Sequence, residues 1–178
     1  MNKEQFWNLI EEARAQEAPG ASGGSVAGRA SALLGVLPVP AIAAAQRTLW
    51  EVLAEAYRMP LWAAAHVING GCSDDGFDHF RGWLMLQGRE VFERAVADPD
   101  ALAGLPEVRA AAPTGRELEC GDTLGIVWRA YRARTGAELP GGSAPGFRPA
   151  ADPGWDFDFG DRAELSRRLP ALSALYGH

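Results

Sequence analysis

Apolar residues recur every three to four positions along most of this chain, the spacing that places them on one face of a helix. In residues 2–17 the apolar stripe consists of Phe6, Leu9, Ile10 and Ala13. Only the stretch WDFDF near the C-terminus alternates as a strand does. The pattern therefore predicts an all-α protein, a bundle-like array of about six to eight helices.

Proline and glycine divide the apolar stretches. Pro38 suits the first turn of a long helix over residues 39–58, because the amides of that turn lack partners within the helix. Pro60 begins the next helix, and Gly70 ends it, since glycine accepts the left-handed conformation of a helix cap. Ser73 is then placed to cap the helix that follows.

The glycine-rich stretch 18–28, APGASGGSVAG, is predicted to be a flexible loop, with a weaker helix over 26–36. Its glycines also hint at a phosphate cradle. That hypothesis lacks the Lys-Ser/Thr pair and the preceding strand that such a cradle requires, so loop flexibility is the preferred interpretation.

A chain of 178 residues has room for one domain with one core. We expect a helical core domain over residues 1–136. Residues 137–154 contain four prolines and four glycines, which predicts an irregular linker. Residues 155–178 end in a short helix, and we expect this C-terminal segment to dock on the core.

The net charge of −6 disfavours a broad nucleic-acid surface, which needs clustered basic residues. A nucleic-acid binder would require Arg129, Arg132 and Arg134 to gather with Arg167 and Arg168 on one face. The N-terminus lacks the apolar core of a signal peptide, and no apolar stretch suits a membrane span. With only two cysteines, we expect a cytoplasmic protein with reduced thiols.

The block NGGCSDDGFDHFRGW concentrates the candidate catalytic residues. Asp75, Asp78 and His79 fall on one helix face, where a carboxylate and an imidazole form an acid–base pair or bind a divalent metal. Asp74 and Arg81 complete a candidate active site. The simpler explanation is structural, because Ser-Asp-Asp is what capping and the helix dipole favour at a helix start. We therefore predict no metal site and no cofactor.

Cys72 is a further candidate, as a nucleophile near a helix N-terminus with His66 or His79 as its base. The alternative is a buried structural thiol, since free cysteines are commonly buried.

Asp158-Phe159-Gly160 matches a kinase tripeptide, but no other kinase motif is present, so chance explains it. Four aspartates within residues 152–161 lack the spacing of a calcium-binding loop. The alternating Trp155, Phe157 and Phe159 are expected to pin the tail to the domain, with the acids facing water.

Six tryptophans are many for this length, and large aromatic side chains fill cores or anchor partners. Trp7 and Trp83 lie beside the apolar stripes of their helices, so both are candidates for partly exposed anchors. We predict a binding surface that combines the polar edge at residues 72–79, which includes Asp78, with Trp83 or with the acidic–aromatic tail around Trp155.

Three stretches resemble the bacterial domain-of-unknown-function 4240 family: FWNLI, the block INGGCSDDGFDHFRGWLMLQGREVFERAVADPDAL, and the tail WDFDF with LPALSALY. The resemblance covers nearly the whole chain. It implies a helical single domain without established activity, so it assigns no catalytic residue. Residues 104–116 are predicted to be a linker. The chain departs from the family pattern there and at residues 18–35, which leaves those loops without guidance.

The sequence thus favours a non-catalytic binding or regulatory module that recognises a protein or a small ligand. The alternative is a hydrolase-like or metal-dependent enzyme built on Asp74, Asp75, His79 and Arg81.

Overall fold

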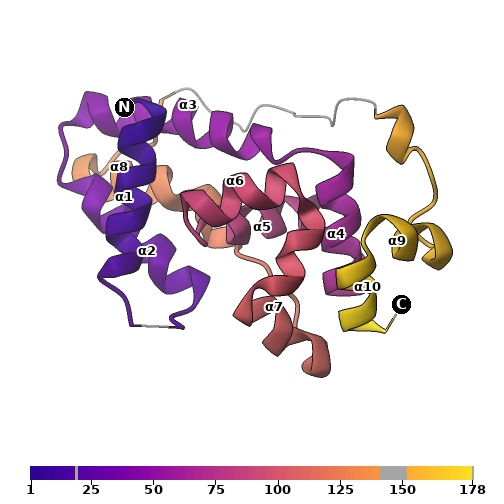
Figure 1. Ribbon diagram of the computed structural model, residues 1–178. Coiled ribbons are helices and arrows are strands. Elements are labelled where there is room, and N and C mark those ends of the chain that lie inside the picture. The colour runs from indigo at the N-terminus through magenta and orange to yellow at the C-terminus, as the bar shows by residue number, and fades with distance from the viewer. Residues whose placement is uncertain (19, 141–151, 178) are drawn as a thin grey trace.

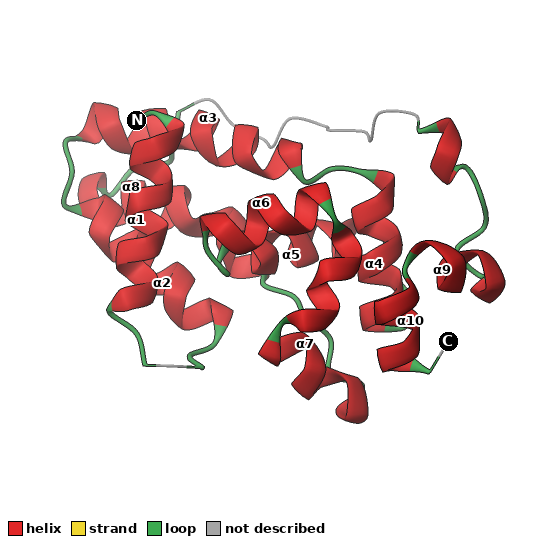
Figure 2. Cartoon of the chain, in the orientation of Figure 1, coloured by secondary structure: helices red, strands yellow, loops and turns green. Residues whose placement is uncertain are grey.

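The computed structural model describes residues 1–18, 20–140 and 152–177. Throughout these residues the chain forms helices and loops without a strand (Figure 2), which confirms the all-α prediction. The α-helices are α1 (Lys3–Ala15), α2 (Gly23–Gly35), α3 (Val39–Glu55), α4 (Met59–Asn69), α5 (Asp74–Met85), α6 (Arg89–Ala97), α7 (Pro106–Ala111), α8 (Ile126–Thr135), α9 (Arg162–Arg168) and α10 (Pro170–Tyr176). Short 3-10 helices lie at η1 (Pro99–Gly104), η2 (Ala112–Thr114), η3 (Gly121–Gly125) and η4 (Pro153–Trp155).

The described residues thus form ten α-helices, against the six to eight that the sequence predicts. The additional helices are short: α7 has six residues, and the C-terminal segment forms two helices of seven residues, α9 and α10, where the sequence predicts one. A helix of two turns is too short to repeat an apolar stripe, so its periodicity is weak.

Helix boundaries follow the capping chemistry of the sequence. Asn2 accepts a hydrogen bond from the Gln5 amide at 2.8 Å, while the Gln5 side chain accepts one from the Asn2 amide at 3.0 Å. Gly70 ends α4 with φ of 67°. Ser73 accepts from the Gly76 amide at 3.1 Å and begins α5. These predicted boundaries are confirmed.

The prediction for the glycine-rich stretch is partly wrong, because α2 already begins at Gly23, with Ser22 as its cap. Packing explains the glycines. A Cβ at Gly23 would lie 3.1 Å from both Cβ and Sγ of Cys120, and one at Gly24 would lie 3.1 Å from a carboxylate oxygen of Asp122. These glycines therefore let two segments approach closely within regular helix.

Helix α5 lies at the centre of the molecule. It contacts η3, α3, α6 and α4, and most of its second half is buried. On one side α2 packs against α1 and α8, and α3 packs against α8; on the other, α4 packs against α10 (Figure 1). The core of buried side chains runs through all of these contacts.

A close backbone approach in the core joins α5 to the segment that precedes η3. A Cβ at Gly82 would lie 2.6 Å from the carbonyl oxygen of Cys120, far inside van der Waals contact. The Cys120 amide donates to the His79 carbonyl at 2.9 Å, and the Thr123 hydroxyl donates to the Gly82 carbonyl at 3.1 Å. Gly82 is therefore required by this contact although it lies inside a helix.

The C-terminal segment contacts the rest of the chain mainly through α10. The carboxylate of Asp100 accepts hydrogen bonds from the amides of Ala171 and Leu172, at 3.0 and 2.9 Å, and so caps the start of α10. The Tyr176 hydroxyl donates to the Val108 carbonyl at 3.0 Å. The predicted linker, residues 137–154, lies largely outside the described residues.

The close contact at Gly82 predicts a reversal of the usual effect of alanine in a helix. Gly82→Ala should lower the free energy of unfolding by about 2 kcal/mol, because an added methyl group in a packed core costs more than helix propensity returns. Gly28→Ala is the matched control in α2, since a Cβ there meets nothing within 4 Å. It should raise that free energy by about 0.5–1 kcal/mol. Urea denaturation followed by circular dichroism measures both, and equal shifts would contradict the packing argument.

Candidate functional site

The acidic turn of the central block faces solvent. Asp74 and Asp75 are exposed in the first turn of α5, next to the Ser73 cap. Both side chains lie outside the hydrogen bonds and ion pairs that the described residues form. Negative charge in the first turn stabilises a helix through its dipole. Their position therefore fits the structural explanation for this block, and a catalytic role for either remains a prediction.

His79 lies on the side of α5 that faces residues 116–120. Its Nδ1 is 3.9 Å from a carboxylate oxygen of Glu119, and its ring packs over Gly121, where a Cβ would lie 3.0 Å from Nε2. The acidic residue that His79 contacts is thus Glu119, which lies outside the predicted cluster.

Arg81 points into the protein, away from the acidic turn. Its guanidinium donates to the Leu53 carbonyl at 2.6 Å, forms an ion pair with Asp78, and lies 4.3 Å from the centre of the Tyr57 ring. Its Nε is buried without a partner among the described residues. Burial lowers the pKa of Arg81, while the hydrogen bond and the charge of Asp78 act in the opposite direction. Arg81 therefore joins α3 to α5, and the Asp78 carboxylate is paired with Arg81.

The Cys72 thiol is partly buried and surrounded by carboxylates. Burial, followed by the charges of Glu117, Asp74 and Glu119, raises the pKa of Cys72 to about 11. A thiol with this pKa is almost fully protonated at neutral pH, whereas a nucleophilic cysteine needs a lowered pKa. The helix start nearby therefore does not activate this thiol.

The expectation that Trp7 and Trp83 are partly exposed is wrong. Trp7 is 1% exposed and packs on Phe92 with ring centres 5.1 Å apart. Trp83 is 4% exposed, and its indole nitrogen donates to Glu107 at 3.1 Å. The expectation assumed one buried stripe per helix, but α5 is covered on several sides. Residues beside the stripe are therefore buried as well.

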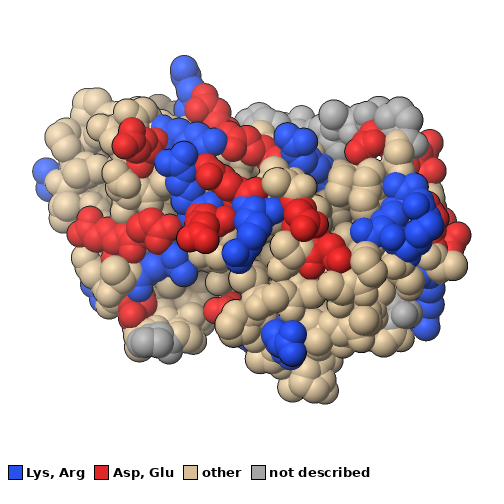
Figure 3. Space-filling model, in the orientation of Figure 1, with Lys and Arg blue, Asp and Glu red and all other residues tan. Residues whose placement is uncertain are grey.

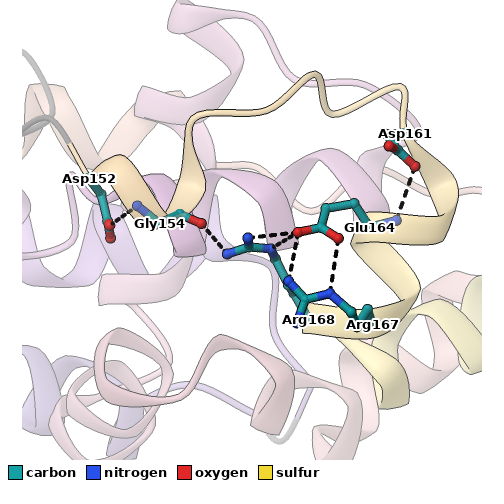
Figure 4. Close-up of polar contacts among 6 residues, drawn as sticks. All are labelled: Asp152, Gly154, Asp161, Glu164, Arg167 and Arg168. Atoms are coloured by element: carbon teal, nitrogen blue, oxygen red, sulfur yellow. Dashed lines mark hydrogen bonds and ion pairs between the residues drawn. The ribbon is translucent and has the colours of Figure 1, made fainter.

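As expected, an aromatic residue of the tail contacts the domain, because the ring centre of Phe159 lies 5.7 Å from that of His66 in α4. Trp155, Phe157 and Phe159 are partly buried and the aspartates between them are exposed. The rings of Trp155 and Phe157 are 5.9 Å apart, and the Arg168 guanidinium lies 4.9 Å from each. Glu164 fixes Arg168 at 2.7 Å (Figure 4). Trp155 is thus covered by Arg168, and its predicted role in partner binding is not tested.

Three of the four aspartates of the tail serve local turns. Asp152 accepts from the Gly154 amide, Asp158 from Gly160 and Asp161 from Glu164, at 3.0, 2.8 and 3.0 Å. Figure 4 shows two of these contacts. Over the whole described part of the chain, no three His, Cys, Asp or Glu side chains are placed to hold a metal ion together.

The arginines that a nucleic-acid surface would need are split between two ends of the molecule. Arg129, Arg132 and Arg134 lie on α8, and Arg167 and Arg168 on α9, at opposite sides of Figure 1. On the face that Figure 3 shows, acidic and basic side chains are interspersed instead of separated. The five arginines therefore do not share one face.

A groove that the sequence did not indicate lies between the start of α2 and the start of α7. It consists of two adjoining hollows of about 340 and 560 Å³. Both are bordered by Gly20, Ala21, Gly23 and Glu107. In Figure 1 these segments face each other on the lower side of the molecule.

The walls of the groove combine apolar side chains with carboxylates. Leu86 borders the smaller hollow, while Trp83, Leu118 and Ala110 border the larger one. Carboxylates in the lining of the larger hollow are Glu107, Glu117 and Glu119, against a single basic side chain, Arg116. The groove is therefore amphipathic with an excess of negative charge.

Both segments that flank the groove were assigned to loops from the sequence, residues 18–28 and 104–116. Glycines and alanines there weaken any apolar pattern, so periodicity gave no signal. Gly82 is the one sequence feature that points toward the groove. A glycine inside an otherwise strong helix suggests a packing reason for its small size. Here the reason is the close approach of Cys120, which directly follows the groove-lining residues 116–119.

The described residues form a small helical domain with a groove. The side chains of the predicted catalytic residues point in different directions: Asp74 and Asp75 to solvent, His79 toward Glu119, and Arg81 into the core. The family model described as "Protein of unknown function (DUF4240)" matches residues 1–133, and the chain belongs to this family. The matched region contains every residue that lines the groove, whereas α9 and α10 lie beyond it. Searches of curated proteins and of solved structures gave no match. Among the described residues, no helix is both long and apolar enough to span a membrane.

The position of Arg81 predicts a strong effect of its removal on stability. Arg81→Met should lower the free energy of unfolding by about 2 kcal/mol, because it removes the buried hydrogen bond to the Leu53 carbonyl, the contact with the Tyr57 ring and the ion pair with the half-exposed Asp78. Arg81→Lys should also destabilise, since an ammonium group cannot reach both hydrogen-bond partners and stack on a ring as the planar guanidinium does. The control is Arg89→Met, which removes the exposed pair with Glu93 and should have little effect. Chemical denaturation measures all three, and a neutral Arg81→Met would refute the structural role.

The raised pKa of Cys72 predicts slow alkylation. In a Cys120→Ser background, iodoacetamide should modify Cys72 roughly tenfold more slowly than free glutathione at pH 8, because the thiolate is scarce. The rate should keep rising beyond pH 10 as the thiol ionises. Glu117→Gln should accelerate the reaction, since it removes a charge that raises the pKa. Mass spectrometry follows the modification, and a rate that levels off below pH 8 would contradict this account.

Proposed function

We propose that this protein is a non-catalytic binding module and that the groove between α2 and α7 is its binding site. The observation that carries the proposal is the groove itself, whose larger hollow of about 560 Å³ falls in the size range of ligand sites. Pro106 and Ala110 offer exposed apolar contact, and Glu107 and Glu117 offer hydrogen-bond acceptors. The groove lies within the part of the chain that the family model matches.

The local chemistry of the central block supports binding over catalysis. Arg81 faces the core, Asp78 pairs with it, and the pKa of Cys72 is raised instead of lowered. Catalysis by Asp74, Asp75 and His79 would have to proceed on an exposed helix start outside the groove. The enzyme hypothesis therefore has less support than the binding hypothesis.

The two cysteines, Cys72 and Cys120, are both unpaired. Free thiols fit a reducing compartment, so we place the protein in the cytoplasm as part of this proposal.

Blocking the groove tests the proposal. Ala110→Trp places a large side chain at an exposed position that lines the larger hollow, whereas Ala133→Trp makes the same change at an exposed position on α8. A thermal-shift screen with amino acids, short peptides, polyamines and nucleotides should identify compounds that raise Tm. Those compounds should stabilise the wild type and Ala133→Trp but not Ala110→Trp.

Two results would overturn the proposal. Compounds that stabilise all three proteins equally, or the absence of any stabilising compound, would remove the groove as the binding site. Chemical conversion of a bound compound, followed by mass spectrometry, would remove the non-catalytic assignment.

A further inference from the structure

One wall of the groove comes from the segment 116–120, which lies outside the helices and ends at Cys120 with the extended backbone angles φ −152° and ψ 92°. In an extended chain, the N–H and C=O groups of alternate residues point to the same edge. The Leu118 amide donates to the Asn69 side chain at 2.9 Å, and the Asn69 side chain donates back to the Leu118 carbonyl at 3.4 Å. The Cys120 amide donates to the His79 carbonyl at 2.9 Å. One edge of this stretch is therefore fixed to α4 and α5.

The opposite edge carries the main-chain groups of Glu117 and Glu119. Neither residue's N–H or C=O takes part in a hydrogen bond among the described residues. Because α4 and α5 cover the first edge, the open edge lies beside the groove, which residues 116–119 line. An open edge of this kind is a template for a further strand, since its donors and acceptors already have the spacing of a β-ladder.

The charge around this edge selects the kind of strand. Glu107 from α7 and the exposed side chains of Glu117 and Glu119 border the larger hollow, and only Arg116 opposes them. Glu107 and Glu117 form no ion pair with a basic residue in the described part of the chain. Lys and Arg side chains at alternate positions of an added strand would project to one face, where they meet these carboxylates.

The N-terminus of α2, at Gly23 and Gly24, also borders the groove, and the positive end of a helix dipole ordinarily attracts anions. Here the Asp122 carboxylate already lies beside Gly24 and occupies that position. Together with the glutamates, it makes the groove unfavourable for a phosphate or a carboxylate ligand.

We propose that the groove binds an extended basic peptide segment of a partner protein, which adds as a strand to the open edge of residues 116–120 and places Lys or Arg side chains against Glu107, Glu117 and Glu119. This inference rests on the proposed function, because it names the ligand of the same groove. Main-chain pairing supplies affinity, and the carboxylates supply the preference for basic sequences.

A random hexapeptide library screened against the full chain tests the ligand class. The bound fraction should be enriched in peptides with Lys or Arg at alternate positions. A fluorescein-labelled copy of the best peptide then serves as the probe in polarisation titrations. Glu117→Gln/Glu119→Gln should raise its Kd about tenfold, whereas Glu51→Gln/Glu90→Gln, at exposed positions outside the groove, makes the same charge change and should leave Kd unchanged.

Main-chain pairing is tested separately by methylating the amide nitrogens of the probe one at a time. Methylation should weaken binding at every second position only, because alternate amides point toward the open edge. Uniform sensitivity, or none, would overturn the strand geometry. Enrichment of acidic or neutral peptides, or an unchanged Kd in the double Gln variant, would overturn the basic-peptide assignment. If Ala110→Trp still blocks other compounds in either case, the groove remains a binding site and only its ligand class is wrong.

Discussion

The close contact between Gly82 in α5 and the Cys120 carbonyl holds the segment before η3 against the central helix. The absence of a side chain at Gly82 lets the chain after α7 lie directly on α5, where the His79 carbonyl accepts a hydrogen bond from the Cys120 amide. Cys120 in turn packs on Gly23 at the start of α2. Two glycines far apart in sequence thus hold the segment 116–120 in place, and that segment forms a wall of the groove.

Arg81 provides the second constraint on α5. A buried guanidinium is costly unless its donors are used, and here its two terminal nitrogens join the end of α3 to Asp78, while the group lies against the Tyr57 ring. The guanidinium of the central block, Arg81, therefore stabilises the fold. Its exposed carboxylates, Asp74 and Asp75, remain at the helix start, where the dipole favours them. The same block that suggests an active site in sequence is mainly a means of fixing α5 in place.

The groove and the C-terminal tail use charge in different ways. In the tail, Glu164, Arg167 and Arg168 neutralise one another, which lowers the pKa of Glu164 to about 2. In the groove, Glu107 and Glu117 lack such partners among the described residues. Unneutralised carboxylates beside an apolar wall are available to a ligand, whereas neutralised ones are not. The groove therefore has carboxylates free to pair with a ligand, although the tail is richer in charged and aromatic residues.

The sequence alone determined the helical class, the capping of α1 and α5, and the glycine end of α4, because these depend on interactions within a few residues. It also indicated the alternation of aromatic and acidic residues in the tail. Tertiary structure decided that Trp7 and Trp83 are buried, that Gly23 begins a helix, and that Arg81 turns inward. Each of these depends on contacts between segments distant in the chain, which periodicity along one helix does not encode. The groove belongs to the same category, since its walls come from residues about a hundred positions apart and no single segment carries its pattern.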